Sequence, residues 1–292
     1  MRRRLVILTR PSAKRAYLAR YGSEGQTRFA MAQSKGGSAD YAKAETEDSA
    51  QARAATGIRK ALPDDIKVAE IDRGMVAQFL FEPHDLVVAV GQDGLVANVG
   101  KYLEGQPLAG VNPDPASIEG ALLPFTVDTF IHALPDLLRD QRPSREVTLA
   151  AAQTSDRQTL RGLNDIFIGV PSHQSARYRI THAGKEEMQS SSGLIVSTGT
   201  GSTGWLRSLI GDKAIFDPAA DKLHFVVREA WPGRGFGATL LEGEVTRQNP
   251  LVIESRMDGI IFADGIEADP LRFDAGVTAT ITPAEQRVRL VQ

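Results

Sequence analysis

The chain has 292 residues, a length that suits two domains better than one core. Its composition, 42% hydrophobic and 24% charged, is that of a soluble globular protein, and a formal net charge of −2 excludes a surface built as a whole to bind nucleic acid. The lack of cysteine excludes a disulfide framework, a thiol nucleophile and a zinc site with Cys ligands.

The N-terminus carries the only tight basic cluster, Arg2, Arg3 and Arg4, followed by just four strongly apolar residues, 5–8. A signal peptide needs a longer apolar stretch, and a membrane span needs about 20 apolar residues. We therefore expect a cytoplasmic, soluble protein with no membrane partner and no nucleic-acid partner.

Apolar runs and helix-like stretches alternate over the first 140 residues. The predicted strands are 5–8, 68–71, 85–90 and 108–111, and the predicted helices are 38–62, 74–80 and 95–103. The polar, glycine-containing segment 22–37 is predicted to be a loop. Because residues 85–90 (DLVVAV) are continuously apolar, we expect them to form a strand of a parallel sheet that is buried on both faces.

Short strand-like segments separated by turn residues dominate after about residue 145. They span 146–150, 166–170, 176–180, 194–197, 223–227, 238–245, 251–254, 260–263, 277–281 and 288–291. The expected fold class is therefore α/β plus all-β, with a parallel-sheet α/β domain over residues 1–140 followed by an antiparallel, β-sandwich-like domain over 145–280. Residues 281–292 are free to return to the first domain.

The turn Gly91-Gln92-Asp93-Gly94 follows the apolar run 85–90 and precedes a predicted helix. Ligands of open α/β sheets bind at the carboxyl ends of such strands. The glycines would let backbone N–H groups approach phosphate oxygens, and Asp93 would face a reacting hydroxyl or a metal ion. The alternative interpretation is a tight turn in which Asp93 caps the helix.

A second glycine-rich loop, Gly199-Thr-Gly-Ser-Thr-Gly204, lies between the predicted strand 194–197 and Trp205. Its short hydroxyl donors suit a nucleotide. The loop matches G-x-G-x-x-G, with Asp217 roughly 20 residues further on, so a Rossmann fingerprint is one alternative. A P-loop is excluded, because Trp205 and Leu206 replace the Lys and Ser/Thr that contact phosphates.

A third feature is the pair Asn164-Asp165, which stands at the start of a predicted strand. An amide beside a carboxylate can bind an adenine edge and a pair of ribose hydroxyls. Taken alone, the same dipeptide is common in turns.

Five motifs follow one another along residues 85 to 270. They are Val90-Gly-Gln-Asp-Gly94, Gly110-Val-Asn112, Leu163-Asn-Asp165, Ser197-Thr-Gly-Thr-Gly-Ser-Thr203 and Asp264-Gly265. In this order they resemble the motifs of the NAD kinase family. The mitochondrial-type subgroup is the more similar one, through residues 111–115 (VNPDP), 163–169 (LNDIFIG) and Ser191-Ser-Gly193.

The resemblance implies a kinase that transfers the γ-phosphoryl group of ATP, with Mg²⁺, to the adenosine 2′-hydroxyl of NAD. It also implies a homodimer or a larger homo-oligomer. Asp93 resembles the family's essential acid beside the reacting ribose. The residues that the resemblance implies for substrate and nucleotide binding are Gly91, Gly94, Asn112, Asn164, Asp165, Thr198, Thr200, Gly201, Ser202, Thr203, Trp205 and Ser208. No residue is assigned as a metal ligand.

Gln92 departs from the family pattern, which has a second glycine there. A side chain at this position could crowd the phosphates, or change the backbone if the family's glycine has a positive φ. Three alternatives stay open: a non-catalytic or altered-substrate NAD-binding protein of the same fold, a Rossmann-type NAD(P) oxidoreductase, and a lipid or sugar kinase with a similar turn. The choices between ATP and polyphosphate, and between NAD and NADH, also stay open.

Overall fold

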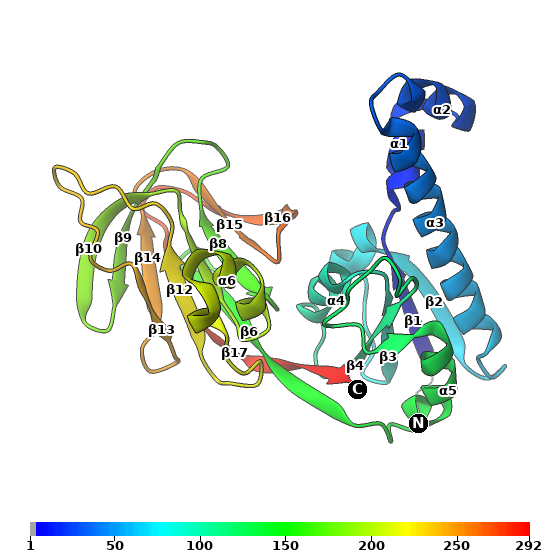
Figure 1. Cartoon of the computed structure of the whole chain (residues 1–292). Coiled ribbons are helices and arrows are strands. Elements are labelled where there is room, and N and C mark those ends of the chain that lie inside the picture. The colour runs from blue at the N-terminus through cyan, green and yellow to red at the C-terminus, as the bar shows by residue number, and fades with distance from the viewer. Residues whose placement is uncertain (1–3) are drawn as a thin grey trace. The chain divides into compact units, whose positions relative to one another are not determined.

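The computed structural model describes residues 4–292, apart from the side chains of residues 266–269, so Arg2 and Arg3 of the basic cluster lie outside the described residues. The chain forms two compact units, whose elements are labelled in Figure 1. The first unit comprises the chain up to Val99 together with Gln106–Ser144 and Arg289–Gln292. The second comprises Gly100–Gly105 and Arg145–Val288. No helix within residues 4–292 is both long and apolar enough to cross a membrane.

The first unit is built from parallel strands and helices. Its elements are β1 (Arg4–Thr9), α1 (Ala13–Tyr21), α2 (Glu24–Ala32), α3 (Gly37–Lys60), β2 (Lys67–Asp72), the 3₁₀ turn η1 (Arg73–Gln78), β3 (Asp85–Val90), α4 (Asp93–Gly100), β4 (Pro107–Asn112), β5 (Phe125–Thr126) and α5 (Val127–Leu138).

The sheet of the first unit has the strand order β4-β3-β1-β2, and every one of these neighbours pairs in parallel. Alternate residues of the strands, such as Ile7 and Val88, pack on Ile58 of α3 and Phe130 of α5. All six residues of β3 are buried, which confirms the expected strand with two covered faces.

The second unit is built mainly from short strands. Its elements are β6 (Ser144–Thr154), β7 (Thr159–Gly162), β8 (Asp165–Gly169), β9 (Ala176–His182), β10 (Lys185–Ser191), β11 (Leu194–Ser197), η2 (Gly201–Thr203), α6 (Trp205–Ile210), η3 (Gly211–Ala214), β12 (Leu223–Val227), β13 (Glu242–Val245), β14 (Leu251–Ser255), β15 (Gly259–Ala263), β16 (Ile266–Phe273) and β17 (Thr278–Val291).

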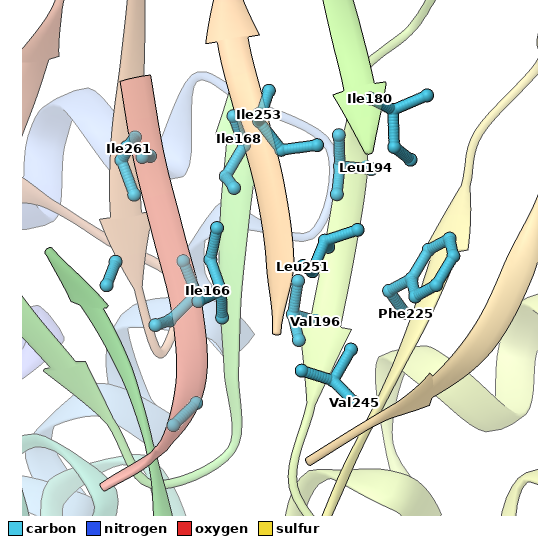
Figure 2. Close-up of a cluster of buried hydrophobic side chains, with 14 of the residues drawn as sticks. Ile166, Ile168, Ile180, Leu194, Val196, Phe225, Val245, Leu251, Ile253 and Ile261 are labelled. Carbon is cyan, nitrogen blue, oxygen red and sulfur yellow. The ribbon is translucent and has the colours of Figure 1, made fainter. Parts of the chain in front are cut away.

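Two antiparallel layers share the core of the second unit. One sheet has the order β13-β12-β11-β8-β15-β16, and the other layer contains β10, β9, β14 and β17. Figure 2 shows Ile166 and Val196 of the first layer gathered with Ile180 and Ile253 of the second. These side chains alternate along their strands, as in two sheets packed face to face. The predicted fold class, α/β followed by an antiparallel β-sandwich, is confirmed.

The prediction that residues 22–37 form a loop is wrong, because α2 lies within them. Ser23 caps this helix, its side chain accepting a hydrogen bond from the amide of Gln26 at 3.2 Å. Only Thr27 and Met31 of α2 are buried. A helix with so little buried surface has no apolar stripe for the sequence pattern to reveal.

Three predicted strands also need correction. Residues 278–281 and 288–291 belong to one strand, β17, rather than two, and residue 277 precedes it. Residues 238–241 precede β13 instead of extending it. The reason is local: the amide of Thr239 donates to the carboxylate of Glu187 at 3.1 Å, not to a neighbouring strand.

Candidate functional site

The turn Gly91–Gly94 lies at the carboxyl end of β3 and leads into α4. The amide of Gly91 donates to the carbonyl oxygen of Val111 in β4 at 3.1 Å, so the turn is tied to the neighbouring strand. A cavity of about 20 Å³ adjoins it, and its lining includes Arg10, Glu47, Gln92 and Asp114. The turn therefore presents backbone and charged groups where open α/β sheets bind ligands.

Asp93 bonds to a segment that follows much later in the chain. Its Oδ2 accepts a hydrogen bond from the amide of Ala121 and its Oδ1 one from the amide of Leu122, each at 2.9 Å. The Asp93 carboxylate therefore binds this separate segment, and both its role as a helix cap and its role toward a substrate stay predictions. Each carboxylate oxygen has a further acceptor site. Half-buried Asp93 can thus fix this segment and still accept a proton or a hydroxyl.

The side chain of Gln92 fits the turn without backbone strain, because this residue is not among those with a positive φ. Whether this backbone differs from that of a glycine at the same position stays a prediction. Asn112 has a different environment. Its Nδ2 donates to the carbonyl oxygen of Ile118 at 2.9 Å, and its Oδ1 accepts from the amide of Asp114 at 3.0 Å. Asn112 thus organises the loop after β4, and its role in nucleotide binding stays a prediction.

In the second unit, the Gly199–Gly204 loop packs directly on the Asn164-Asp165 pair. Thr198 Oγ1 donates to the carbonyl oxygen of Leu163 at 2.5 Å. The backbone amide of Thr198 donates to the carbonyl oxygen of Asn164 at 2.9 Å. A Cβ at Gly201 would lie 2.1 Å from the Asn164 carbonyl oxygen. Two motifs predicted separately are therefore brought together, and glycine is required at Gly201 for this approach.

The hydroxyl groups predicted to bind a nucleotide fall into two sets. Thr198 and Ser202 are fully buried, and their hydroxyls donate to backbone carbonyls of the second unit itself. Thr203 and Ser208 are exposed. The Oγ1 of Thr200 is buried and has no hydrogen-bond partner among the residues that the structure describes. The hydroxyls of Thr203 and Ser208 also donate to backbone carbonyls, at 3.5 Å and 2.7 Å, but because these residues are exposed, they and Thr200 retain bonding capacity for a ligand.

Trp205 is anchored by neighbours that the sequence interpretation did not single out. Its ring stacks on Phe167 at 5.8 Å between centroids and 14° between planes. The guanidinium carbon of Arg228 lies 5.3 Å from the Trp205 ring centroid, a cation–π distance. Phe167 in turn contacts Phe262 at 4.8 Å. Phe167 follows the Asn164-Asp165 pair by two residues, and this position in the sequence could have identified it as a neighbour of the site.

Asp264 is a further residue of this region, and it lies in the Asp264-Gly265 motif between β15 and β16. Its carboxylate accepts hydrogen bonds from three consecutive amides, those of Leu163 at 3.0 Å, Asn164 at 2.6 Å and Asp165 at 3.3 Å. The sequence interpretation used this motif for the resemblance but assigned Asp264 no role in the site.

The buried carboxyl groups of Asp165 and Asp264 both have raised pKa values. Burial raises the pKa of Asp165 to about 7, and the nearby charge of Asp264 adds to the effect. Burial also raises the pKa of Asp264 to about 6, but its backbone N–H donors oppose this. No described residue donates a hydrogen bond to the Asp165 carboxyl, which is 6% exposed. Of the two carboxyl groups, Asp165 is therefore the one that keeps its proton to the higher pH.

The Rossmann interpretation of the Gly199–Gly204 loop is wrong. The preceding strand, β11, pairs antiparallel with both β8 and β12, so the βαβ crossover of a dinucleotide fingerprint is absent from this part of the described chain. Asp217, which would bind a ribose in that fingerprint, instead forms an ion pair with Arg145 at 2.5 Å.

No family model matches the chain, and no curated protein matches its sequence. Solved structures do share its fold. An NAD kinase from Archaeoglobus fulgidus in complex with ATP has a TM-score of 0.62 and 16% identity, covering 99% of this chain and 93% of that one. Yeast NADH kinase complexed with NADH has a TM-score of 0.62 and 14% identity, covering 100% of this chain and 84% of that one. The chain has the NAD kinase fold.

Within this NAD kinase fold, the predicted site residues divide between the units. Gly91, Asp93, Gly94 and Asn112 belong to the first unit, and all the others belong to the second. At identities of 14% and 16%, the likeness shows the fold and leaves the roles of single residues as predictions. The mitochondrial-type subgroup likewise stays a prediction.

Proposed function

We propose that the protein is a kinase of NAD or NADH, which transfers the γ-phosphoryl group of ATP to the adenosine 2′-hydroxyl and forms NADP or NADPH. The observation that carries the proposal is the Asp93 carboxylate, fixed by two backbone amides at the carboxyl end of the parallel sheet. Its support is the shared fold with an NAD kinase in complex with ATP and an NADH kinase complexed with NADH.

Asp93 would act on the acceptor hydroxyl. The 2′-oxygen attacks the γ-phosphorus, the bond to the bridging oxygen of ADP breaks, and ADP leaves with that electron pair. The hydroxyl proton passes to the Asp93 carboxylate, whose two amide donors fix its position while leaving acceptor sites free. Phosphoryl transfer requires mainly such positioning together with charge neutralisation.

The phosphates of ATP would bind beside Gly91 and Gln92. Arg10 and Gln92 both line the same cavity, and the guanidinium of the first and the side-chain amide of the second would supply hydrogen-bond donors for phosphate oxygens. Gln92, the residue that favoured a non-catalytic protein, would then contribute a donor to the site. Gln92 has no positive φ, so its side chain adds no backbone strain to the turn.

Mg²⁺ would arrive with ATP. Among residues 4–265 and 270–292, no three His, Asp or Glu side chains gather closely enough to hold a metal by themselves. Two carboxylates, Glu47 and Asp114, line the cavity beside Gln92, and Mg²⁺ is usually bound through one or two carboxylates plus substrate phosphates. These two residues therefore fit a magnesium ion carried by ATP, which would neutralise phosphate charge.

The dinucleotide would bind through the second unit. The Asn164 side chain is half-buried and would read the adenosine through its amide. Asp165, whose pKa burial raises to about 7, would in its protonated form offer both a donor and an acceptor to a ribose hydroxyl. Exposed Thr203 and Ser208 would contact the rest of the dinucleotide, with Trp205 beside them.

The test is to incubate the purified full chain with NAD or NADH, Mg²⁺, and either ATP or polyphosphate. An NADP-specific dehydrogenase then detects the product. We expect product with ATP from the wild type and its loss in Asp93→Asn. Binding of NAD without product from any donor would favour the non-catalytic alternative. Light scattering after size exclusion would test the homodimer or larger homo-oligomer that we also propose.

A further inference from the structure

We propose that Asp264 is a positioning residue, which holds Asn164 and Asp165 in the conformation that binds the dinucleotide. This role rests on the function proposed above. The Asp264 carboxylate accepts three consecutive amides, and the amide of Asp264 donates back to the carbonyl oxygen of Asp165 at 3.0 Å. Hydrogen bonds to an ionised acceptor are stronger than those between neutral groups.

The backbone of 163–165 is bonded on its other side as well. Thr198 Oγ1 donates to the carbonyl oxygens of Leu163 at 2.5 Å and Asn164 at 3.2 Å. The amide of Gly201 donates to that same hydroxyl at 3.2 Å. The N–H groups of residues 163–165 thus bond to Asp264, and the carbonyl oxygens of Leu163 and Asn164 bond to Thr198. The backbone of this segment is bonded within the second unit. Its side chains are then what it offers to a ligand.

The local turn alone does not explain an aspartate at this position. Asp264 and Gly265 connect β15 to β16 and both have positive φ, at 56° and 66°. A two-residue hairpin of this kind accepts Asn-Gly, Asp-Gly or Gly-Gly equally well in conformational terms. Only a carboxylate presents two acceptor oxygens to three N–H groups. An amide in its place would turn an NH₂ group toward at least one of them.

What sets Asp264 apart is the segment that it binds. Its Oδ2 accepts the amide of Leu163 and its Oδ1 those of Asn164 and Asp165, the two residues that would contact the dinucleotide. We therefore place the effect of Asp264 in the pair that it orients. Its negative charge has a second consequence, because it favours the proton on the neighbouring Asp165 carboxyl.

Asp264→Asn removes the carboxylate but keeps the turn conformation, since asparagine tolerates positive φ. The matched control is Asp274→Asn, which removes one charge from an aspartate that pairs with Arg272 at 3.0 Å directly after β16. Three quantities are measured on the full chain: NAD affinity, ATP affinity by calorimetry, and hydrogen exchange of the amides of residues 163–165. Asp264→Gly, which also keeps positive φ, is the second variant in case the asparagine protein does not fold.

We expect Asp264→Asn to weaken NAD binding roughly tenfold or more, leave ATP affinity unchanged, and speed exchange of the 163–165 amides roughly tenfold. Asp274→Asn should match the wild type in all three. Unchanged NAD affinity, unchanged exchange at 163–165, or an equal loss of NAD and ATP affinity would each overturn the proposed role. A wild type that binds no NAD would instead overturn the proposed function, while the exchange data would still show whether Asp264 fixes the segment.

Discussion

Both units of this protein fix a segment of the candidate site with a carboxylate that accepts neighbouring backbone amides. In the first unit Asp93 accepts the amides of Ala121 and Leu122. In the second, Asp264 accepts those of residues 163–165. The two carboxylates differ in the role proposed for each. Asp93 is itself the candidate catalytic group, whereas Asp264 orients other residues. Structure and chemistry can therefore be separated by mutation in the second unit more easily than in the first.

The second unit also holds a pair of neighbouring carboxyl groups. Asp165 and Asp264 lie close enough for the charge of Asp264 to raise the pKa of Asp165. Dependence on pH within the neutral range is therefore expected from the second unit's pair.

The largest expected effect comes from Asp93→Asn. Loss of a general base typically costs 10²–10⁴-fold in rate, so we expect NADP formation to fall by at least about 100-fold. Hydrogen exchange of the Ala121 and Leu122 amides, measured on the same protein, tests whether the loss of activity comes from a disturbed structure of this segment. Lost activity with unchanged exchange would assign Asp93 to chemistry, and full activity would remove it from the catalytic role.

Gly201→Ala should break the contact between the Gly199–Gly204 loop and the Asn164 backbone. A Cβ at 2.1 Å from a carbonyl oxygen forces a backbone shift, and we expect a loss of about 3 kcal/mol in the free energy of unfolding. Urea denaturation measures it. The control is Gly25→Ala in the first turn of α2, where a Cβ meets nothing within 4 Å. Equal stability of the two variants would contradict the close packing.

Asp165→Asn should change the dependence of stability on pH. Because the folded-state pKa of Asp165 is raised from 3.8 to about 7, the folded protein binds this proton more tightly than the unfolded chain. The resulting stability is present at low pH and is lost as the pH rises toward 7. Between about pH 5 and pH 8 the variant should therefore gain on the order of 2 kcal/mol relative to the wild type. A difference that stays constant with pH would mean that Asp165 is ionised throughout.

The smallest expected effect on stability is that of Gly94→Ala. A Cβ there meets nothing within 4 Å, and alanine favours a helix over glycine by about 1 kcal/mol or less. Gly25→Ala is again the matched control, because each glycine is the second residue of its helix. If phosphates approach the backbone of the Gly91–Gly94 turn, Gly94→Ala should lower NADP formation while both variants melt at or slightly above the wild-type temperature. Unchanged NADP formation by Gly94→Ala would show that the phosphates do not contact this residue.

The sequence by itself determined the features that depend on near neighbours. The apolar run of β3 predicted a buried strand, and the strand spacing after residue 145 predicted the β-sandwich, because burial imposes short periods on a chain. The tertiary structure alone decided which polar groups remain for a ligand. Asp93 and Asp264 meet amides 28 to 101 residues away, and Thr198 and Ser202 are turned inward. Such contacts depend on how strands and loops distant in sequence pair in the fold, and local propensity cannot predict them.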